Sequence, residues 1–161
     1  MNETFTAKRA VWKYTQTIEA GPSDVFPLLC PVREAEWLDG WRYKMIYSQS
    51  GVAEAGCVFT TPGQGEADTV WVISRHDQEK LRVEFARFTP ENRVCTLGIQ
   101  VEDAGPKRSF VHIAYVYTGI SDAGNRFIDG FTEERFLSAV RFWEDAMNHF
   151  LKTGEKLARE T

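Results

Sequence analysis

The sequence has no long apolar run and no dense cluster of basic residues. No stretch approaches the ~20 consecutive apolar residues of a membrane-spanning helix, and the opening MNETFT lacks the basic and apolar regions of a secretion signal. The 19 Lys and Arg residues are scattered between Lys8 and Arg159, and the formal net charge is -4. Nucleic acid is therefore disfavoured as a partner, no membrane span is expected, and we expect a cytoplasmic protein.

Cysteines are few and common catalytic motifs are absent. Cys30, Cys57 and Cys95 lie too far apart for a CxxC redox pair or a zinc knuckle, so no metal or cofactor is implied. Their apolar neighbours favour buried free thiols, and a reactive thiol is the alternative. The chain has no GxSxG elbow, no HExxH helix and no glycine-rich loop ending in Gly-Lys-Ser/Thr. No catalytic motif therefore identifies a reaction.

The composition is that of a folded domain. Of the 161 residues, 43% are hydrophobic and 26% are charged, which is ordinary for a globular protein and unlike a disordered chain. A chain of this length fits one domain and buries well over half of its unfolded surface. We expect a single domain that spans residues 1–161.

Alternating apolar and polar residues predict seven strands. The first, at residues 10–20, ends at Gly21-Pro22, and two short helices follow it, the second at residues 32–36. Six further strands are separated by turn-forming residues, and such short connections indicate antiparallel neighbours. These strands are expected at residues 43–47, 57–61, 68–75, 80–88, 93–101 and 109–118.

Beyond Asn125 the apolar period changes from two to about 3.6 residues, which predicts a long amphipathic helix. Asn125 and Thr132 are alternative N-caps, with Gly130 as a break between them, and Gly154 ends the helix. Its apolar stripe comprises Phe136, Val140, Trp143, Met147, Phe150 and Leu151.

This order of elements predicts an α+β fold with a hollow. Seven strands span about 30 Å, whereas one helix with its side chains is only ~10–12 Å across. A single helix covers such a sheet only if the antiparallel sheet curves around it. A hollow then remains between the helix and the far part of the concave wall, and a ligand would bind there.

Two segments resemble uncharacterised bacterial members of the START-like SRPBCC superfamily, namely PVREAEWLDGW at residues 31–41 and YSQSGVAEAGCVFTT at residues 47–61. Tyr117-Thr118 and Gly124-Asn125 are also similar to that group. The superfamily includes polyketide cyclases, lipid-transfer proteins and plant hormone receptors. The resemblance implies its helix-grip fold and a pocket, but no particular reaction. Cys57 lies in the second segment and is the candidate if a thiol is reactive.

Aromatic residues are the main candidates for the pocket wall. In resembling proteins the region of Trp37 forms one rim, although Trp37 could instead fasten the short helices to the sheet. Alternation places Phe85 on the apolar face of its strand, but it leaves the direction of Trp71 open because both faces there are apolar. The ligand-binding candidates are Trp37, Phe59, Trp71, Phe85, Arg87, His112, Thr118 and Trp143.

Two polar candidates carry chemical implications. Arg87 shares the face of Phe85, and a buried guanidinium needs a partner, which an acidic ligand would supply; the alternative is that Arg87 reaches solvent at the rim. Of the three histidines, only His112 is expected to reach the cavity, on one face with Thr118 and opposite Tyr115. An imidazole and a hydroxyl in an apolar cavity can transfer protons, so His112 is the candidate catalytic residue.

Three functions fit these features. The first is binding or carrying a small hydrophobic molecule, neutral or acidic. The second is a cyclase- or dehydratase-like reaction in the same cavity. The third is a co-chaperone-like protein-interaction domain, which requires an exposed apolar patch on the convex face or the helix. Monomer and homodimer are both open, because an edge strand can pair with a second copy.

Overall fold

The computed structural model describes residues 4–160, and these form seven strands and a set of helices. The strands are β1 Arg9–Ile18, β2 Lys44–Tyr47, β3 Val58–Thr61, β4 Thr69–Asp77, β5 Arg82–Thr89, β6 Arg93–Asp103 and β7 Ser109–Gly119. The helices are α1 Pro22–Val25, the short 3-10 helix η1 Phe26–Leu28, α2 Pro31–Trp37, α3 Asp122–Gly130 and α4 Glu133–Thr153. The predicted domain range also includes residues 1–3 and 161, which lie outside the described residues.

All seven strands belong to one antiparallel sheet, in the order β1-β7-β6-β5-β4-β3-β2. The neighbours from β2 to β7 follow chain order, as the short turns predict, and β1 pairs with β7 over its whole length. The predicted α+β class with a curved seven-stranded antiparallel sheet is therefore confirmed.

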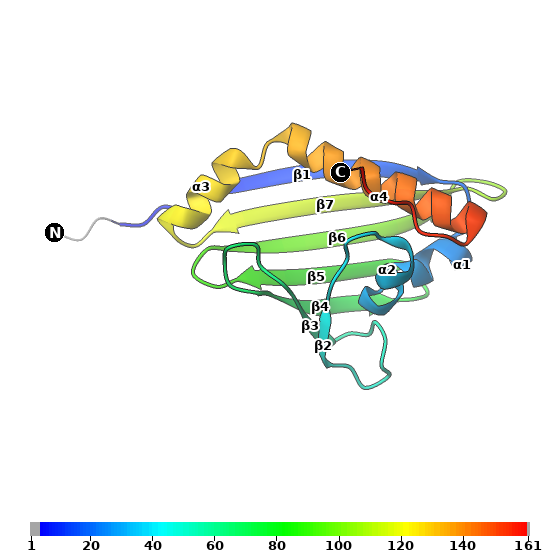
Figure 1. Cartoon of the computed structure of the whole chain (residues 1–161), viewed down its shortest axis with the longest axis horizontal. Coiled ribbons are helices and arrows are strands. Elements are labelled where there is room, and N and C mark those ends of the chain that lie inside the picture. The colour runs from blue at the N-terminus through cyan, green and yellow to red at the C-terminus, as the bar shows by residue number, and fades with distance from the viewer. Residues whose placement is uncertain (1–3, 161) are drawn as a thin grey trace.

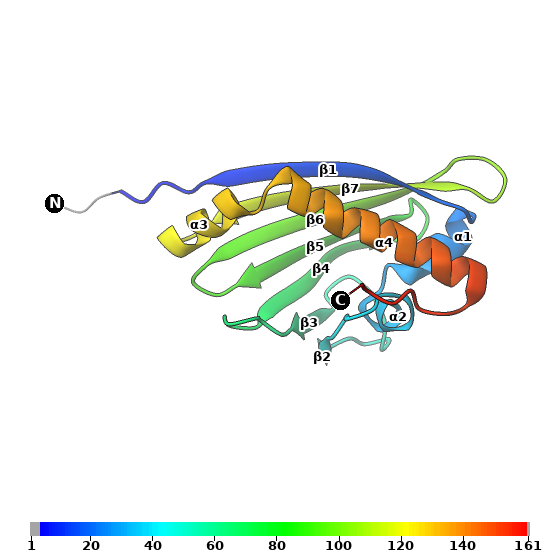
Figure 2. The same cartoon turned by 45° about the horizontal axis from the view of Figure 1, so that its top comes forward.

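The long C-terminal helix α4 lies across the concave face of the sheet, with α1 and α2 beside its C-terminal end (Figures 1 and 2). The Thr132 side chain caps its start by accepting from the Arg135 amide, and Gly154 ends it in the left-handed region at φ +76°. Glu144 fastens α4 to β1, because its carboxylate accepts from the Tyr14 hydroxyl at 2.8 Å and from the Thr17 amide at 2.6 Å.

Aromatic side chains pack against α4 from both α2 and the sheet. Trp37 stacks on Trp143 with ring centres 6.3 Å apart, and Trp12 stacks on Phe136 at 6.2 Å. The concave side therefore does not hold one wide hollow. Separate pockets remain towards the two ends of the sheet.

The convex face carries a row of mostly apolar residues, of which Val11 is 54% exposed. In register across six strands lie Val11, Val116, Thr96, Ala86, Val72 and Val58. Beside this row, Val70 pairs with Phe88, and their side chains are 37% and 42% exposed. Val116, Ala86, Val72 and Val58 are only partly exposed, so among these residues the exposed apolar surface lies at Val11 and at the paired Val70 and Phe88. Within the described part of the chain, no helix is long and apolar enough to cross a membrane.

Candidate functional site

The strand β5 carries an arginine into the interior. Along β5 the buried residues are Val83, Phe85 and Thr89, and Arg87 occupies the same alternating positions, whereas Phe88 is exposed on the convex face. Arg87 therefore lies on the concave side. It retains some accessible surface, and that surface faces a pocket.

The surroundings of Arg87 are aromatic and contain no paired carboxylate. Its guanidinium carbon lies 4.9 Å from the ring centre of Trp71, 5.1 Å from that of Tyr115 and 5.5 Å from that of Tyr117. Its Nη2 donates a hydrogen bond to the Tyr117 hydroxyl. Every ion pair found within residues 4–160 involves other basic side chains. Arg87 thus brings a positive charge into the interior without an acidic partner from the described chain.

The pocket at Arg87, called the Arg87 pocket below, has a volume of about 140 Å³ and a polar lining. Hydroxyl groups are prominent in it: those of Thr69 and Thr89 lie 2.9 Å apart, and that of Thr61 accepts from the Trp71 indole at 2.9 Å. The lining residues are Thr61, Thr69, Trp71, Arg87, Thr89, Arg93, Cys95 and Tyr117.

The second arginine of this pocket is already neutralised. Arg93 forms two hydrogen bonds with the Glu66 carboxylate, at 3.0 and 3.2 Å, and its guanidinium lies 3.5 Å from the ring centre of Phe127 in α3. The uncompensated positive charge of the Arg87 pocket therefore belongs to Arg87.

The phenols and the thiol beside Arg87 are neutral. Burial raises the pKa of Tyr115 and of Tyr117 above the usual phenol value, although the Arg87 charge opposes the increase. Burial likewise raises the pKa of the Cys95 thiol. These groups cannot supply the missing negative charge near pH 7, but each can donate a hydrogen bond.

A second unusual group is the carboxyl of Glu34 on α2. Burial raises its pKa to about 8, so it is mostly protonated at neutral pH. It is close enough to Tyr115 to contribute to the raised pKa of that phenol. Interior polar atoms without a partner among the described residues are the indole nitrogens of Trp12 and Trp143 and the Gln16 amide oxygen.

The aromatic candidates divide between packing and pocket. Trp37 is fully buried, and its indole donates to the Leu28 carbonyl at 3.0 Å while it stacks on Trp143. Phe59 stacks on Trp71 at 5.2 Å, and Phe85 meets Trp71 edge to face at 5.8 Å. Of the five aromatic candidates, Trp71 is the one that also lines the Arg87 pocket.

The predicted inward positions of His112 and Thr118 are wrong. On β7 the concave face carries Tyr115 and Tyr117, and the even-numbered residues face the convex side. The His112 side chain is 41% exposed, with Nε2 2.6 Å from Glu102 and Nδ1 2.9 Å from the Thr15 hydroxyl. Both faces of this strand carry apolar and aromatic residues, so the pattern does not indicate which one is buried.

His76 is the histidine that faces the concave side, and the sequence did not predict it. The pairing of β4 with β5 shifts between Ile73 and Arg75, so a bulge interrupts the alternation. Beyond the bulge His76 pairs with Val83, which is fully buried. Within residues 4–160 no group of three His, Cys, Asp or Glu side chains is arranged to hold a metal ion.

Solved structures share this architecture at low sequence identity. Truncated norcoclaurine synthase from Thalictrum flavum matches with a TM-score of 0.69 and 12% identity, over 94% of this chain and 99% of that one. A hypothetical protein from Helicobacter pylori matches with a TM-score of 0.70 and 9% identity, over 88% and 87%. DynU16, from the dynemicin biosynthetic locus, matches with a TM-score of 0.60 and 14% identity, over 90% of this chain and 48% of that one.

The chain therefore has the helix-grip fold that these structures share, which confirms the predicted fold class. No protein-family model matches the sequence. No curated protein matches it either.

Proposed function

We propose that this protein binds a small, partly aromatic organic anion in the Arg87 pocket. The observation that carries the proposal is the Arg87 guanidinium, which lies in the interior against three aromatic rings with no acidic partner from residues 4–160. A buried charge without a counter-charge is strongly unfavourable. A ligand carboxylate would supply that counter-charge through two parallel hydrogen bonds.

The pocket supports a ligand of limited size. A volume of about 140 Å³ accommodates an anionic head and a short apolar part, and the rings of Trp71 and Tyr117 offer flat surfaces for stacking. The hydroxyls of Thr61, Thr69 and Thr89 can donate to anionic oxygens. One structure of norcoclaurine synthase, which shares the fold, contains dopamine and hydroxybenzaldehyde. Small aromatic molecules therefore fit within a helix-grip scaffold.

The test compares an acid with its neutral isostere. Calorimetric titration with trans-cinnamate and with cinnamamide should show binding that prefers the acid by at least about tenfold, or ~1.4 kcal/mol. Arg87→Met should abolish that preference. Arg82→Met is the matched control, because Arg82 lies on the same strand but pairs with Glu84 on the convex face. Equal affinity for acid and amide, or an acid preference that survives in Arg87→Met, would reject the proposal.

A cyclase- or dehydratase-like reaction is the second candidate. It is favoured by the neutral Glu34 carboxyl, which lies close enough to Tyr115 to affect the pKa of that phenol, since a protonated acid can transfer protons. Glu34 and Tyr115 replace His112 in this hypothesis. Glu34→Gln should then leave the cinnamate affinity unchanged and abolish turnover of any substrate that is found.

A further inference from the structure

A β-bulge brings an imidazole to the concave side at the opposite end of the sheet from Arg87. With strict alternation, Trp71 and Ile73 would be followed on the buried face by Arg75. The pairing shift makes Arg75 the neighbour of Glu84 on the convex face and makes His76 the neighbour of Val83. Bulges commonly redirect a side chain next to a functional site.

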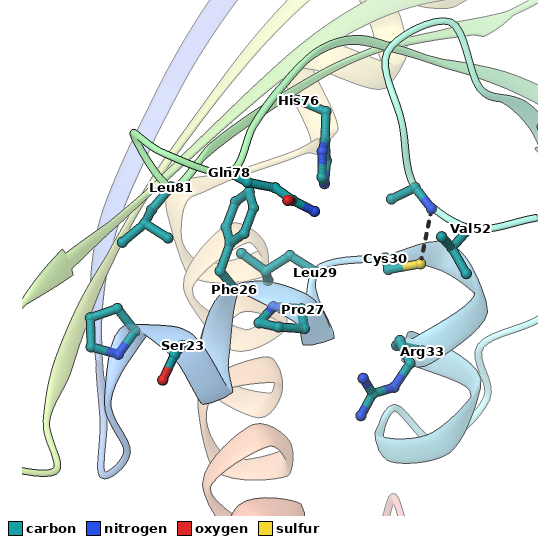
Figure 3. Close-up of a pocket in the computed structure, with 12 residues that line it drawn as sticks. Ser23, Phe26, Pro27, Leu29, Cys30, Arg33, Val52, His76, Gln78 and Leu81 are labelled. Atoms are coloured by element: carbon teal, nitrogen blue, oxygen red, sulfur yellow. Dashed lines mark hydrogen bonds between the residues drawn. The ribbon is translucent and has the colours of Figure 1, made fainter. Parts of the chain in front are cut away.

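His76 lines a pocket of about 450 Å³, called the His76 pocket below (Figure 3). The volume lies within the ~300–1,000 Å³ of small-molecule sites. The helices supply its apolar floor, where Phe26 and Cys30 are each 5% exposed and Leu29 is 1% exposed. The lining residues are Pro22, Ser23, Phe26, Pro27, Leu29, Cys30, Arg33, Val52, Ala53, His76, Gln78 and Leu81.

This pocket carries no uncompensated charge. No Asp or Glu lines it, and its one cation, Arg33, is paired with Glu36 at 2.7 Å. Burial lowers the pKa of His76 although Asp77 acts in the opposite direction, so the imidazole is mostly neutral at pH 7. An ionic ligand would lose its hydration here with no opposite charge to compensate.

Two polar side chains can orient a ligand. Figure 3 shows the Gln78 amide and the His76 ring directed to the same part of the pocket, beside Leu29. The His76 ring lies 5.3 Å from the Phe26 ring, tilted by 36°. An amide and a neutral imidazole each offer both a donor and an acceptor. The surroundings thus combine a flat apolar surface with neutral hydrogen-bonding groups.

We propose that the His76 pocket is a second binding site, which takes a neutral, flat, largely apolar molecule with a carbonyl or hydroxyl group for His76 and Gln78. It shares no lining residue with the Arg87 pocket. Arg82, which follows the lining residue Leu81, and Arg87 are about 17 Å apart along β5 at ~3.4 Å per residue. This site is therefore independent of the function proposed for Arg87.

The experiment uses prodan, a neutral naphthalene ketone whose emission shifts to shorter wavelength in apolar surroundings. Prodan should bind the wild-type protein saturably with a stoichiometry of one. Val52→Trp, at a lining position that is 43% exposed, should narrow the pocket and raise the Kd for prodan by about tenfold. His76→Phe keeps a ring but removes the proposed hydrogen bonds to the ligand, and should raise the Kd for prodan by about threefold or more.

Matched controls separate this site from the rest of the molecule. Val11→Trp makes the same change at a convex position that is 54% exposed, and Arg87→Met alters only the other pocket. Both should keep the prodan Kd within about twofold of wild type. The proposal is overturned if wild type shows no saturable binding, if both Val52→Trp and His76→Phe bind like wild type, or if Arg87→Met abolishes binding.

Discussion

The guanidinium of Arg87 lies 4.9 Å from the centre of the Trp71 ring and donates a hydrogen bond to Tyr117, which is itself a neutral phenol. Cation–π contacts of this kind stabilise a cation by about 0.5–2 kcal/mol. That is less than the several kcal/mol lost when one ion leaves water. On this balance, an anion that pairs with Arg87 would add to the stability of the folded protein.

Arg87→Met should make the unliganded protein more stable. Replacing a buried, incompletely paired charge with an apolar side chain of similar length is expected to raise the free energy of unfolding by about 1–3 kcal/mol. Urea denaturation at pH 7 measures the change. Arg82→Met, which removes a partly exposed ion pair, should change it by less than ~1 kcal/mol. A clear loss of stability in Arg87→Met would show that the protein already satisfies this charge.

Glu34→Gln should change how stability depends on pH. Because the folded-state pKa of about 8 lies above the unfolded value of 4.5, the protonated carboxyl favours folding. That contribution is complete below about pH 4.5 and is lost as the pH rises through 8. Wild type should lose on the order of 3 kcal/mol relative to Glu34→Gln between pH 5 and 9. Thermal unfolding of both proteins across this range measures this difference in stability. Parallel pH profiles would contradict the raised pKa of Glu34.

His112→Phe should leave ligand binding unchanged. The side chain lies on the convex face, in an exposed pair with Glu102. Pairs of this kind contribute about 0–1 kcal/mol, so the stability should change within that range. Titration with trans-cinnamate compares the variant with wild type. A loss of affinity greater than about tenfold would place the imidazole in contact with the ligand.

The three cysteines should react slowly in the native protein. Cys57 is fully buried, its thiol lies 3.6 Å from the Met45 sulfur, and burial raises its pKa to about 11. Cys30 and Cys95 are also buried. Labelling with a chromogenic disulfide should become rapid only after unfolding in urea. Rapid native labelling that Cys57→Ala removes would restore the reactive-thiol alternative.

The sheet and the long helix were predictable because each depends on a local signal. Turn-forming residues such as Gly105-Pro106 separate the strands, and the 3.6-residue stripe that includes Phe136 and Val140 identifies the face of α4 that is buried. The inward position of Arg87 also agrees with the alternation on β5.

The details of the site were less predictable because they depend on register and tertiary packing. On β7, Phe110, His112 and Ala114 oppose Ile113 and Tyr115, so alternation does not distinguish the two faces. The bulge before His76 arises from pairing with β5 and has no clear mark in its own sequence. The width of the hollow depends on how Trp37 and Trp143 stack, which the lengths of the elements do not determine.

If the proposed anion binds at Arg87, the uncompensated charge there also links the amount of protein in a cell to that ligand. A ligand that binds only the folded chain lowers the fraction of molecules that are unfolded at any moment, and proteases act mainly on that fraction. Molecules without an anion at Arg87 would be degraded sooner than those that hold one. The abundance of this protein would then follow the supply of the small acid proposed to bind there.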